Sequence, residues 1–159
     1  MVLDPDTQAF LESGCALIVA TVGPDGAPHA GRGWGLEILD ASPWPQLRLL
    51  LDAEDERSIA HISDGGTPIA VTATNVVLLR SMQMKGRARD PEVATRRDIE
   101  RAQRYIEDFF ANVHVTDATT WERFESFLPT GYVACTVEVH ERFDQTPGPG
   151  AGARIEAAS

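Results

Sequence analysis

The chain has 159 residues and a formal net charge of −10, with 24 acidic against 14 basic side chains. Because no run of Lys and Arg concentrates charge of the opposite sign, we expect it to bind neither nucleic acid nor anionic membranes. A hydrophobic share of 43% suits a soluble protein with one core, and no apolar stretch approaches the roughly 20 residues that cross a bilayer.

The N-terminal residues lack the basic segment that opens a signal peptide. Cys15 and Cys135 both lie in apolar stretches, so we expect two reduced thiols in the core. Together these features predict a cytoplasmic protein.

The first 90 residues predict two short helices and five strands joined by turns. Asp4 followed by Pro5 is a helix start, and the later segments alternate apolar and polar residues as strands do. Turn residues separate them. The expected elements are a helix over 5–13, strands over 15–22, 29–39 and 47–52, a helix over 54–63, a turn over 64–68, and strands over 69–77 and 79–89.

The pattern then becomes helical before one last strand. Asp90, Pro91 and Glu92 supply a capping side chain, a first-turn proline and a first-turn acid, which predicts a helix over 91–111. A shorter apolar stripe covers 121–128, and residues 132–139 alternate again. A late strand must pair with a sheet already formed, and closure into a small barrel avoids a bare edge.

These elements predict an α+β fold: a six-stranded antiparallel β-barrel with flanking helices. We expect one domain over residues 1–145. Residues 146–159 contain the run Pro-Gly-Pro-Gly-Ala-Gly and are expected to form a flexible tail.

The fifth predicted strand holds the most informative segment. Its alternation buries Met82 and Met84 and leaves Ser81, Gln83 and Lys85 on the other face, a polar row that suits an anion or the edge of a heteroaromatic ring. Gly86 indicates a bulge or a close backbone approach. A solvated strand face with a bulge is the alternative interpretation.

Four segments in order resemble the pyridoxamine 5′-phosphate oxidase-like flavin-binding split barrels. They are Ile-Val-Ala-Thr-Val…Asp-Gly-Ala-Pro-His at 18–29, Gly-Arg-Gly-Trp-Gly at 31–35, Leu-Arg-Leu-Leu-Leu at 47–51 and Met-Gln-Met-Lys-Gly-Arg-Ala at 82–88. The resemblance implies a split barrel that works as a homodimer, with flavin mononucleotide (FMN) in a cleft between the subunits. A deazaflavin, haem or no cofactor remain alternatives.

The resemblance also assigns positions for the cofactor. It places phosphate-binding cations at Arg32 and Arg57, whereas the second residue of the family's basic pair is here Ser58. It places Ser81 at the flavin, with Gln83 and Lys85 on the same strand face. Trp34 either stacks on a planar cofactor or packs at the subunit interface. Glu37 and Asp52 stand where the fullest oxidases have Lys and Thr.

Acidic residues surround the predicted phosphate site. Asp52, Glu54, Asp55 and Glu56 lie at the start of the helix over 54–63, where they satisfy free N–H groups and the helix dipole. They also repel a phosphate, so Arg32 and Arg57 would hold it against local acid.

The remaining candidates are weaker. His29, His61, His114 and His140 have no metal-binding spacing, so we expect no metal. No residue stands out as an acid, base or nucleophile, so none is assigned a catalytic role. Two classes of function stay open: an FMN-dependent oxidoreductase of unknown substrate, and a non-catalytic small-molecule binding module with a degraded phosphate site.

Overall fold

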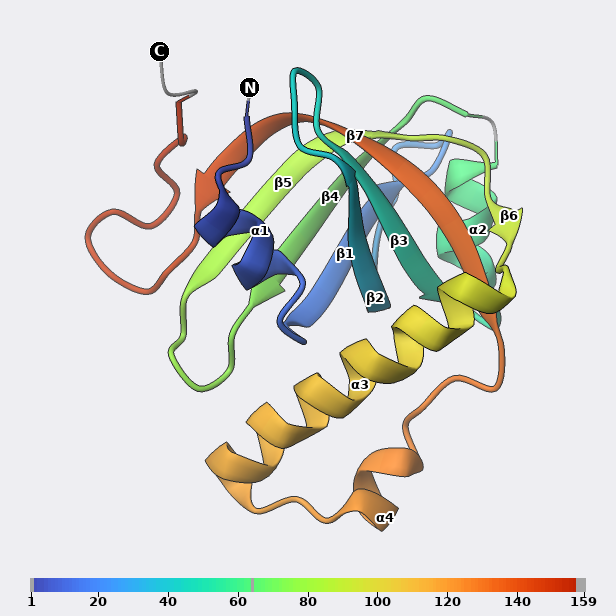
Figure 1. The fold of residues 1–159 in the computed structure, drawn as a ribbon. Coiled ribbons are helices and arrows are strands. Elements are labelled where there is room, and N and C mark those ends of the chain that lie inside the picture. The colour runs from blue at the N-terminus through green and yellow to red at the C-terminus, as the bar shows by residue number, and fades with distance from the viewer. Residues whose placement is uncertain (1, 64, 157–159) are drawn as a thin grey trace.

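The computed structural model describes residues 2–63 and 65–156. Its elements in chain order are α1 (Pro5–Leu11), β1 (Ala16–Val22), β2 (Pro28–Asp40), β3 (Gln46–Asp52), α2 (Glu56–Ile62), β4 (Thr67–Thr74), β5 (Ser81–Ala88), β6 (Glu92–Val93), α3 (Arg96–Asp117), α4 (Trp121–Glu125) and β7 (Tyr132–Asp144). Helix α3 runs diagonally across one side of the barrel, and α4 lies beyond it (Figure 1). No helix among the described residues is long and apolar enough to cross a membrane.

Six strands of the described chain close into an antiparallel barrel, which confirms the predicted α+β class. Their order is β3-β2-β1-β4-β5-β7, and β3 pairs with β7 to complete the ring. The short strand β6 lies outside this ring and pairs with the start of β7. Closure leaves no long free edge, which is the physical reason for expecting a barrel.

The alternation of side chains along β1 divides the barrel into an inside and an outside. Leu17 and Val19 are 1% and 0% exposed and belong to the main core. On the opposite face Ile18 and Val22 are 45% and 42% exposed. This strand therefore presents apolar residues to both sides, although one side has no cover within the described chain.

Gly86 lies at the bulge that the sequence predicts. The register between β5 and β7 shifts between Lys85 and Gly86. A Cβ at Gly86 would overlap the carbonyl oxygen of Glu138, so a close backbone approach requires glycine at this position.

The predicted helix start at Pro91 is wrong. Glu92 and Val93 form β6 against β7 instead, and α3 begins at Arg96 after the N-cap Thr95. Thr95 and Asp98 form a capping box, in which each side chain accepts from the backbone N–H of the other. This cap, together with the pairing of β6, prevails over the weaker signal of Asp90 and Pro91.

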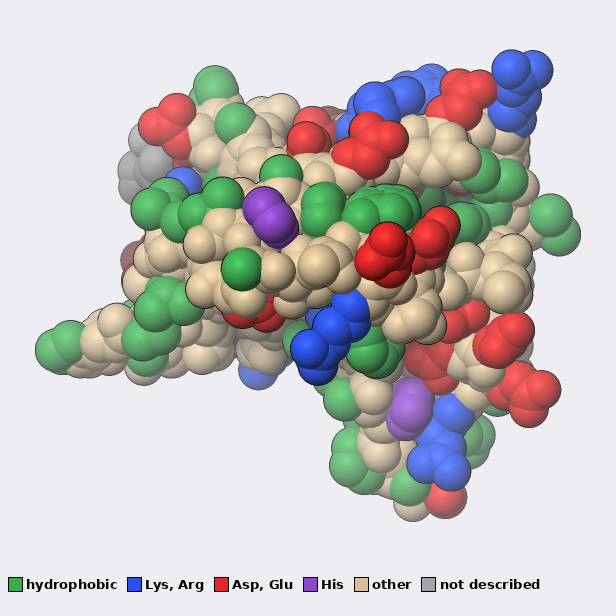
Figure 2. Space-filling model, turned by 90° about the horizontal axis from the view of Figure 1, so that it is seen from below, with side chains coloured by type: hydrophobic (Ala, Val, Ile, Leu, Met, Phe, Trp, Pro, Cys, Tyr) green, Lys and Arg blue, Asp and Glu red, His purple; other side chains and the backbone are tan. Residues whose placement is uncertain are grey.

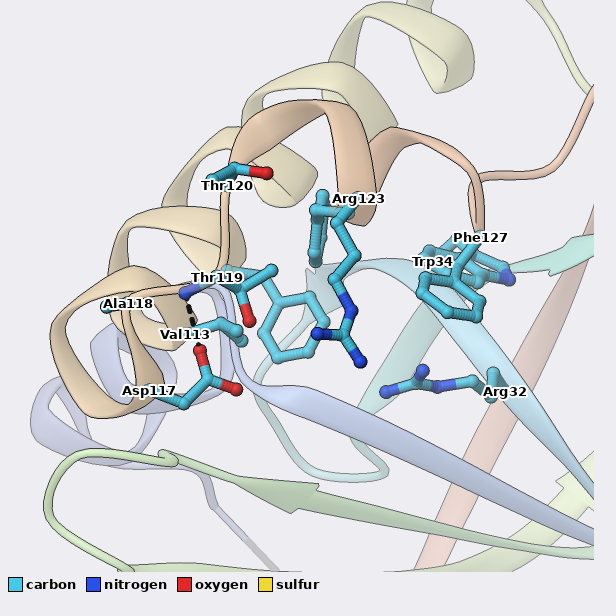
Figure 3. Close-up of a pocket in the computed structure, with 11 residues that line it drawn as sticks. Arg32, Trp34, Val113, Asp117, Ala118, Thr119, Thr120, Arg123 and Phe127 are labelled. Atoms are coloured by element: carbon cyan, nitrogen blue, oxygen red, sulfur yellow. Dashed lines mark hydrogen bonds between the residues drawn. The ribbon is translucent and has the colours of Figure 1, made fainter.

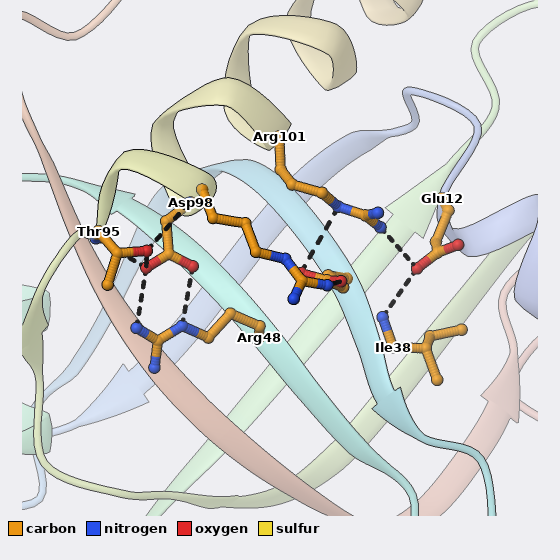
Figure 4. A network of polar contacts seen from close by, with 8 residues as sticks. Glu12, Ile38, Arg48, Thr95, Asp98 and Arg101 are labelled. Atoms are coloured by element: carbon orange, nitrogen blue, oxygen red, sulfur yellow. Dashed lines mark hydrogen bonds and ion pairs between the residues drawn. The ribbon is translucent and has the colours of Figure 1, made fainter.

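Asp98 also fastens α3 to the barrel (Figure 4). Its carboxylate accepts two hydrogen bonds from Arg48 on β3, at 3.1 Å from Nε and 3.0 Å from Nη2. Farther along α3, Arg101 donates to Glu12 at 2.9 Å, and Glu12 in turn accepts from the backbone N–H of Ile38. Both contacts hold the helix across the outer face of β2 and β3.

Residues 146–156, part of the predicted tail, turn back along β7. The N–H of Ile155 donates to the Arg142 carbonyl at 2.8 Å, and the N–H of Asp144 donates to the Ala153 carbonyl at 2.9 Å. Ile155 packs against the main core. The domain boundary at residue 145 stays a prediction, and residues 64 and 157–159 of the predicted turn and tail lie outside the described residues.

We expect Asp98→Ala to lower the free energy of unfolding by about 2–4 kcal/mol, because it leaves a mostly buried Arg48 without its bidentate partner and removes half of the capping box. Urea denaturation measures this loss. Arg96→Ala is the matched control: it breaks the exposed pair of Arg96 with Glu100, which should change stability by less than about 0.5 kcal/mol. Equal losses in the two variants would contradict the anchoring role.

The contact between Asp98 and Arg48 should make the free energy of unfolding depend on pH in the acidic range. Hydrogen bonds from Arg48 lower the pKa of Asp98 from 3.8 to about 2. Since the folded pKa lies below the unfolded one, the stabilisation is complete above about pH 4 and disappears as the pH falls through about 2. The stability difference between the wild type and Asp98→Ala should therefore shrink across that window.

Candidate functional site

A cavity of about 730 Å³ opens between β2 and the α3–α4 segment. Figure 3 shows it from close by. The outward side of β2 forms one wall, and the end of α3, the connection after it and α4 form the others. The lining residues are Arg32, Trp34, Phe109, Val113, Asp117, Ala118, Thr119, Thr120, Arg123, Phe124 and Phe127.

Aromatic side chains build the floor of this cavity. Trp34, Phe109 and Phe124 belong to one apolar cluster, and Trp34 is 6% exposed. The Phe109 and Phe124 ring centroids lie 5.6 Å apart in an edge-to-face arrangement. Trp34 thus packs against α3 and α4 while still lining the cavity, and its expected role at a planar cofactor or at a subunit interface stays a prediction.

Two arginines extend into the cavity from different elements. The Arg32 guanidinium of β2 lies 5.4 Å from the Trp34 ring centroid and 5.8 Å from that of Phe109. Arg123 reaches the same space from α4 (Figure 3). Among the described residues, neither arginine has a carboxylate within ion-pair distance.

One acid lies at the rim. Asp117, at the end of α3, accepts a hydrogen bond from the Thr119 N–H at 2.9 Å. The Thr119 side chain and then its backbone N–H lower the pKa of Asp117, with a smaller contribution from Arg123. The cavity therefore combines two cations, one carboxylate and an aromatic floor.

The polar row on β5 lies on the same outer sheet face as Arg32. Strand register pairs Arg32 with Ile18, Ile18 with Thr72, and Thr72 with Gln83. Three strand spacings separate Arg32 from Gln83, about 14 Å. A ligand that contacts both would cross the outer face of β1 and β4.

Ser81, Gln83 and Lys85 of β5 differ in the exposure of their side chains and in their hydrogen-bond partners. Ser81 lies on the predicted outer face but is only 7% exposed and shares a 2.7 Å hydrogen bond with Thr74. The C-terminal segment covers it, since the Ser81 N–H donates to Thr146. Gln83 Nε2 donates to Thr72 at 3.1 Å. Lys85 is exposed, and its Nζ lies 4.5 Å from the Phe143 ring centroid.

Arg57 and Ser58 lie on α2, apart from this cavity. Arg57 is exposed, whereas Ser58 is 0% exposed and its N–H donates to Asp55. Asp55 caps α2 and also pairs with His29 at 2.9 Å. Asp52 accepts the Glu54 N–H. As the sequence indicates, these acids satisfy the N–H groups at the start of α2 themselves.

Sequence reasoning missed Arg123, Phe109 and Phe124 as cavity residues. The two phenylalanines lie within the predicted helical segments 91–111 and 121–128, and they also belong to an apolar cluster. The available signal was Arg123 itself, a cation directly before Phe124 on a short apolar stripe. Which side of α4 it faces depends on the packing of α4 against α3, which no local pattern encodes.

The other candidate reactive groups of the described chain lie outside the cavity or have low reactivity. Burial raises the pKa of Cys15 to about 11, and that of Cys135 to about 12, so both stay protonated thiols at neutral pH. No three His, Cys, Asp or Glu side chains come together as metal ligands within residues 2–63 and 65–156.

No family model matches the chain, and no curated protein sequence does. Solved structures do. HupZ from Group A Streptococcus superposes with a TM-score of 0.55 at 16% identity, over 94% of this chain and 99% of that one. A proposed pyridoxamine 5′-phosphate oxidase from Lactobacillus delbrueckii gives 0.53 at 18% identity, over 89% and 93%. At such identities the likeness concerns the fold, and the chain has the split-barrel fold of the pyridoxamine 5′-phosphate oxidase-related proteins, as its motifs indicate.

Proposed function

We propose that this protein binds FMN and acts as a flavin-dependent oxidoreductase on a small molecule, with the cofactor lying on the outer sheet face between two subunits. The observation that carries the proposal is Arg32. Its guanidinium has no carboxylate partner among the described residues and lies in an aromatic cavity at the edge of an uncovered sheet.

The cavity fits a phosphate. The rings of Trp34 and Phe109 hold the face of the Arg32 guanidinium, which leaves its N–H groups free for the oxygens of an anion. A volume of about 730 Å³ lies within the range of small-molecule sites. Binding of the phosphate here would direct the rest of the cofactor along β1 and β4 toward β5.

The β5 side supplies donors for a heteroaromatic ring. Gln83 holds one amide hydrogen bond to Thr72 and retains further capacity, and Lys85 is an exposed cation. FMN, when bound, supplies the hydride or electron transfer. The chain's own part is to hold the phosphate, orient the ring and exclude water, which agrees with the lack of a reactive thiol in the cavity.

The outer face of β1 supports the dimer. Ile18, Ala20 and Val22 are exposed along this strand, and Ala70 of β4 lies beside Ala20. Neighbouring apolar residues of this kind, on strands that are already fully paired, favour a face-to-face contact with a partner. A second copy of the chain would bury this surface and cover the cofactor on the outer sheet face.

We expect Arg32→Ala to weaken FMN binding by about 1.5–3 kcal/mol, the value of a charged hydrogen bond, with little change for riboflavin, which lacks the phosphate. Quenching of flavin fluorescence measures both. Arg104→Ala, which removes an exposed cation from the middle of α3 outside the cavity lining, is the control for net charge. The resemblance predicts the same selective loss for Arg57→Ala.

Equal losses for FMN and riboflavin would show that Arg32 does not bind the phosphate. If the wild type takes up neither flavin, the binding-module alternative leads, and titration with deazaflavin and haem then tests the other ligands.

The oxidoreductase role has its own test. The FMN-loaded protein should lose its visible flavin band when NADPH or NADH is added anaerobically and regain it with an electron acceptor. Tight FMN binding without reduction by either nucleotide would favour a non-catalytic module.

We expect the wild type to sediment as a dimer at micromolar concentration, and Ile18→Glu with Val22→Glu to sediment as a monomer, because two buried carboxylates would oppose the interface. Val93→Glu changes an apolar residue that is 89% exposed on β6 and should leave the dimer intact. A wild-type monomer would contradict both the dimer and an interfacial cofactor.

A further inference from the structure

We propose that Arg123 of α4 is the second cation of the anion subsite, so that Arg32 and Arg123 together bind the phosphate monoester of a flat aromatic ligand. This deepens the proposed function and rests on the same cavity. It assigns a binding role to α4, to which neither the sequence motifs nor the resemblance gives one.

Within the described chain, Arg32 and Arg123 place two guanidinium groups in one cavity without an ion pair. In a chain with ten more acids than bases, arginines such as Arg48, Arg97 and Arg101 contact carboxylates. Arg32 and Arg123, like several other arginines of the described chain, do not, but these two line the same cavity. Two guanidinium groups that face the same space repel one another. An anion bound between them would replace that repulsion with charge-assisted hydrogen bonds.

Their placement suits an anion with several oxygens. Arg32 extends from a strand and Arg123 from a helix, and their side chains enter the cavity from different walls (Figure 3). A phosphate between them could accept hydrogen bonds from both guanidinium groups at once. A carboxylate, with fewer oxygens, would satisfy the two groups less completely. Phe109 and Phe124 beneath them provide the contact for a flat ring.

Asp117 restricts where the anion can lie. Its hydrogen bond with Thr119 keeps its carboxylate charged at the rim of the cavity. A dianion would therefore lie toward Arg32 and Arg123 and away from Asp117. Asp117 is also the acid that the cavity lining offers to offset the charge of Arg123.

Arg123 also explains how the site could tolerate Ser58. The resemblance expects a second cation beside Arg57, but Ser58 is 0% exposed and acids occupy the start of α2. Arg57 lies outside the cavity that holds Arg32. The cation missing on α2 is thus replaced by one from α4, which aromatic contacts such as Phe110 with Trp121, at 4.9 Å between centroids, hold against α3.

A pair of probes that differ by one phosphate tests this without a flavin: 1-naphthyl phosphate and 1-naphthol, titrated calorimetrically at low salt. We expect the wild type to prefer the phosphate, and Arg123→Ala to lose at least tenfold in affinity for it, with naphthol unchanged. Arg123→Lys should restore part of the loss, since it keeps the charge without the fork. Arg104→Ala is the control for net charge.

The double variant Arg32→Ala/Arg123→Ala measures whether the two side chains act together. We expect its loss to differ from the sum of the single losses for the phosphate and not for naphthol, since both arginines bind one group. Unchanged phosphate affinity in Arg123→Ala, or equal losses for both probes, would overturn the proposal. So would a wild type that shows no preference for the phosphate.

The two proposals fail separately. A protein that ignores FMN but binds naphthyl phosphate through both arginines refutes the flavin assignment and supports the subsite. A protein that binds FMN through Arg32 and Arg57, with Arg123→Ala unchanged toward both FMN and naphthyl phosphate, supports the flavin assignment and overturns the role of Arg123.

Discussion

The contact of Asp98 with Arg48 decides where the rest of the site lies. It joins the first turn of α3 to β3 through two hydrogen bonds, while the same carboxylate completes the helix cap. A 22-residue helix that is fixed at its first turn has its far end placed by geometry. That far end carries Asp117 and leads into α4, so the cavity beside Arg32 depends on a contact at the opposite end of α3.

The second constraint is the two-sided character of β1. Its inward residues belong to the core, and its outward residues are apolar without cover in the described chain. Helix α3 covers the outer face of β2 and β3 but leaves β1 and β4 open (Figure 1). On the side seen from below, apolar side chains lie among charges of both signs, without a continuous basic surface (Figure 2). Such a surface suits a protein partner better than a polyanion.

Most of the fold could be predicted from local signals. Period-two alternation located the strands, and Gly86 marked the bulge, because both follow from backbone geometry that a short segment encodes. The start of α3 could not be predicted in this way. Asp90 with Pro91 and Thr95 with Asp98 are both plausible caps, and the choice depended on the pairing of Glu92 and Val93 with β7 and on Arg48, some 50 residues earlier.

The candidate site, like the fold, includes residues that local sequence signals reveal and residues that they do not. Arg32 and Trp34 could be found from sequence because they occupy a strand whose motif is local, and they do line one cavity. Arg123 could not, because its place depends on two helices that meet only after folding. Ser81, Gln83 and Lys85 were correctly placed on one outer strand face, but the segment after β7 returns to cover Ser81.

The distribution of charge explains why we propose the anion subsite beside α4 and not at the start of α2. Acids at the start of α2 satisfy that helix end with their own side chains, so a phosphate would have to displace existing contacts there. No such contacts restrain Arg32, whose guanidinium rests on aromatic rings. Under the proposed assignment, an anion entering this acidic protein would be drawn to the cavity below α4 rather than to α2. The barrel could then remain unchanged while its anion subsite differs in the helix that serves it, because the strand that carries Arg32 contacts α2 and also lines the cavity with α4.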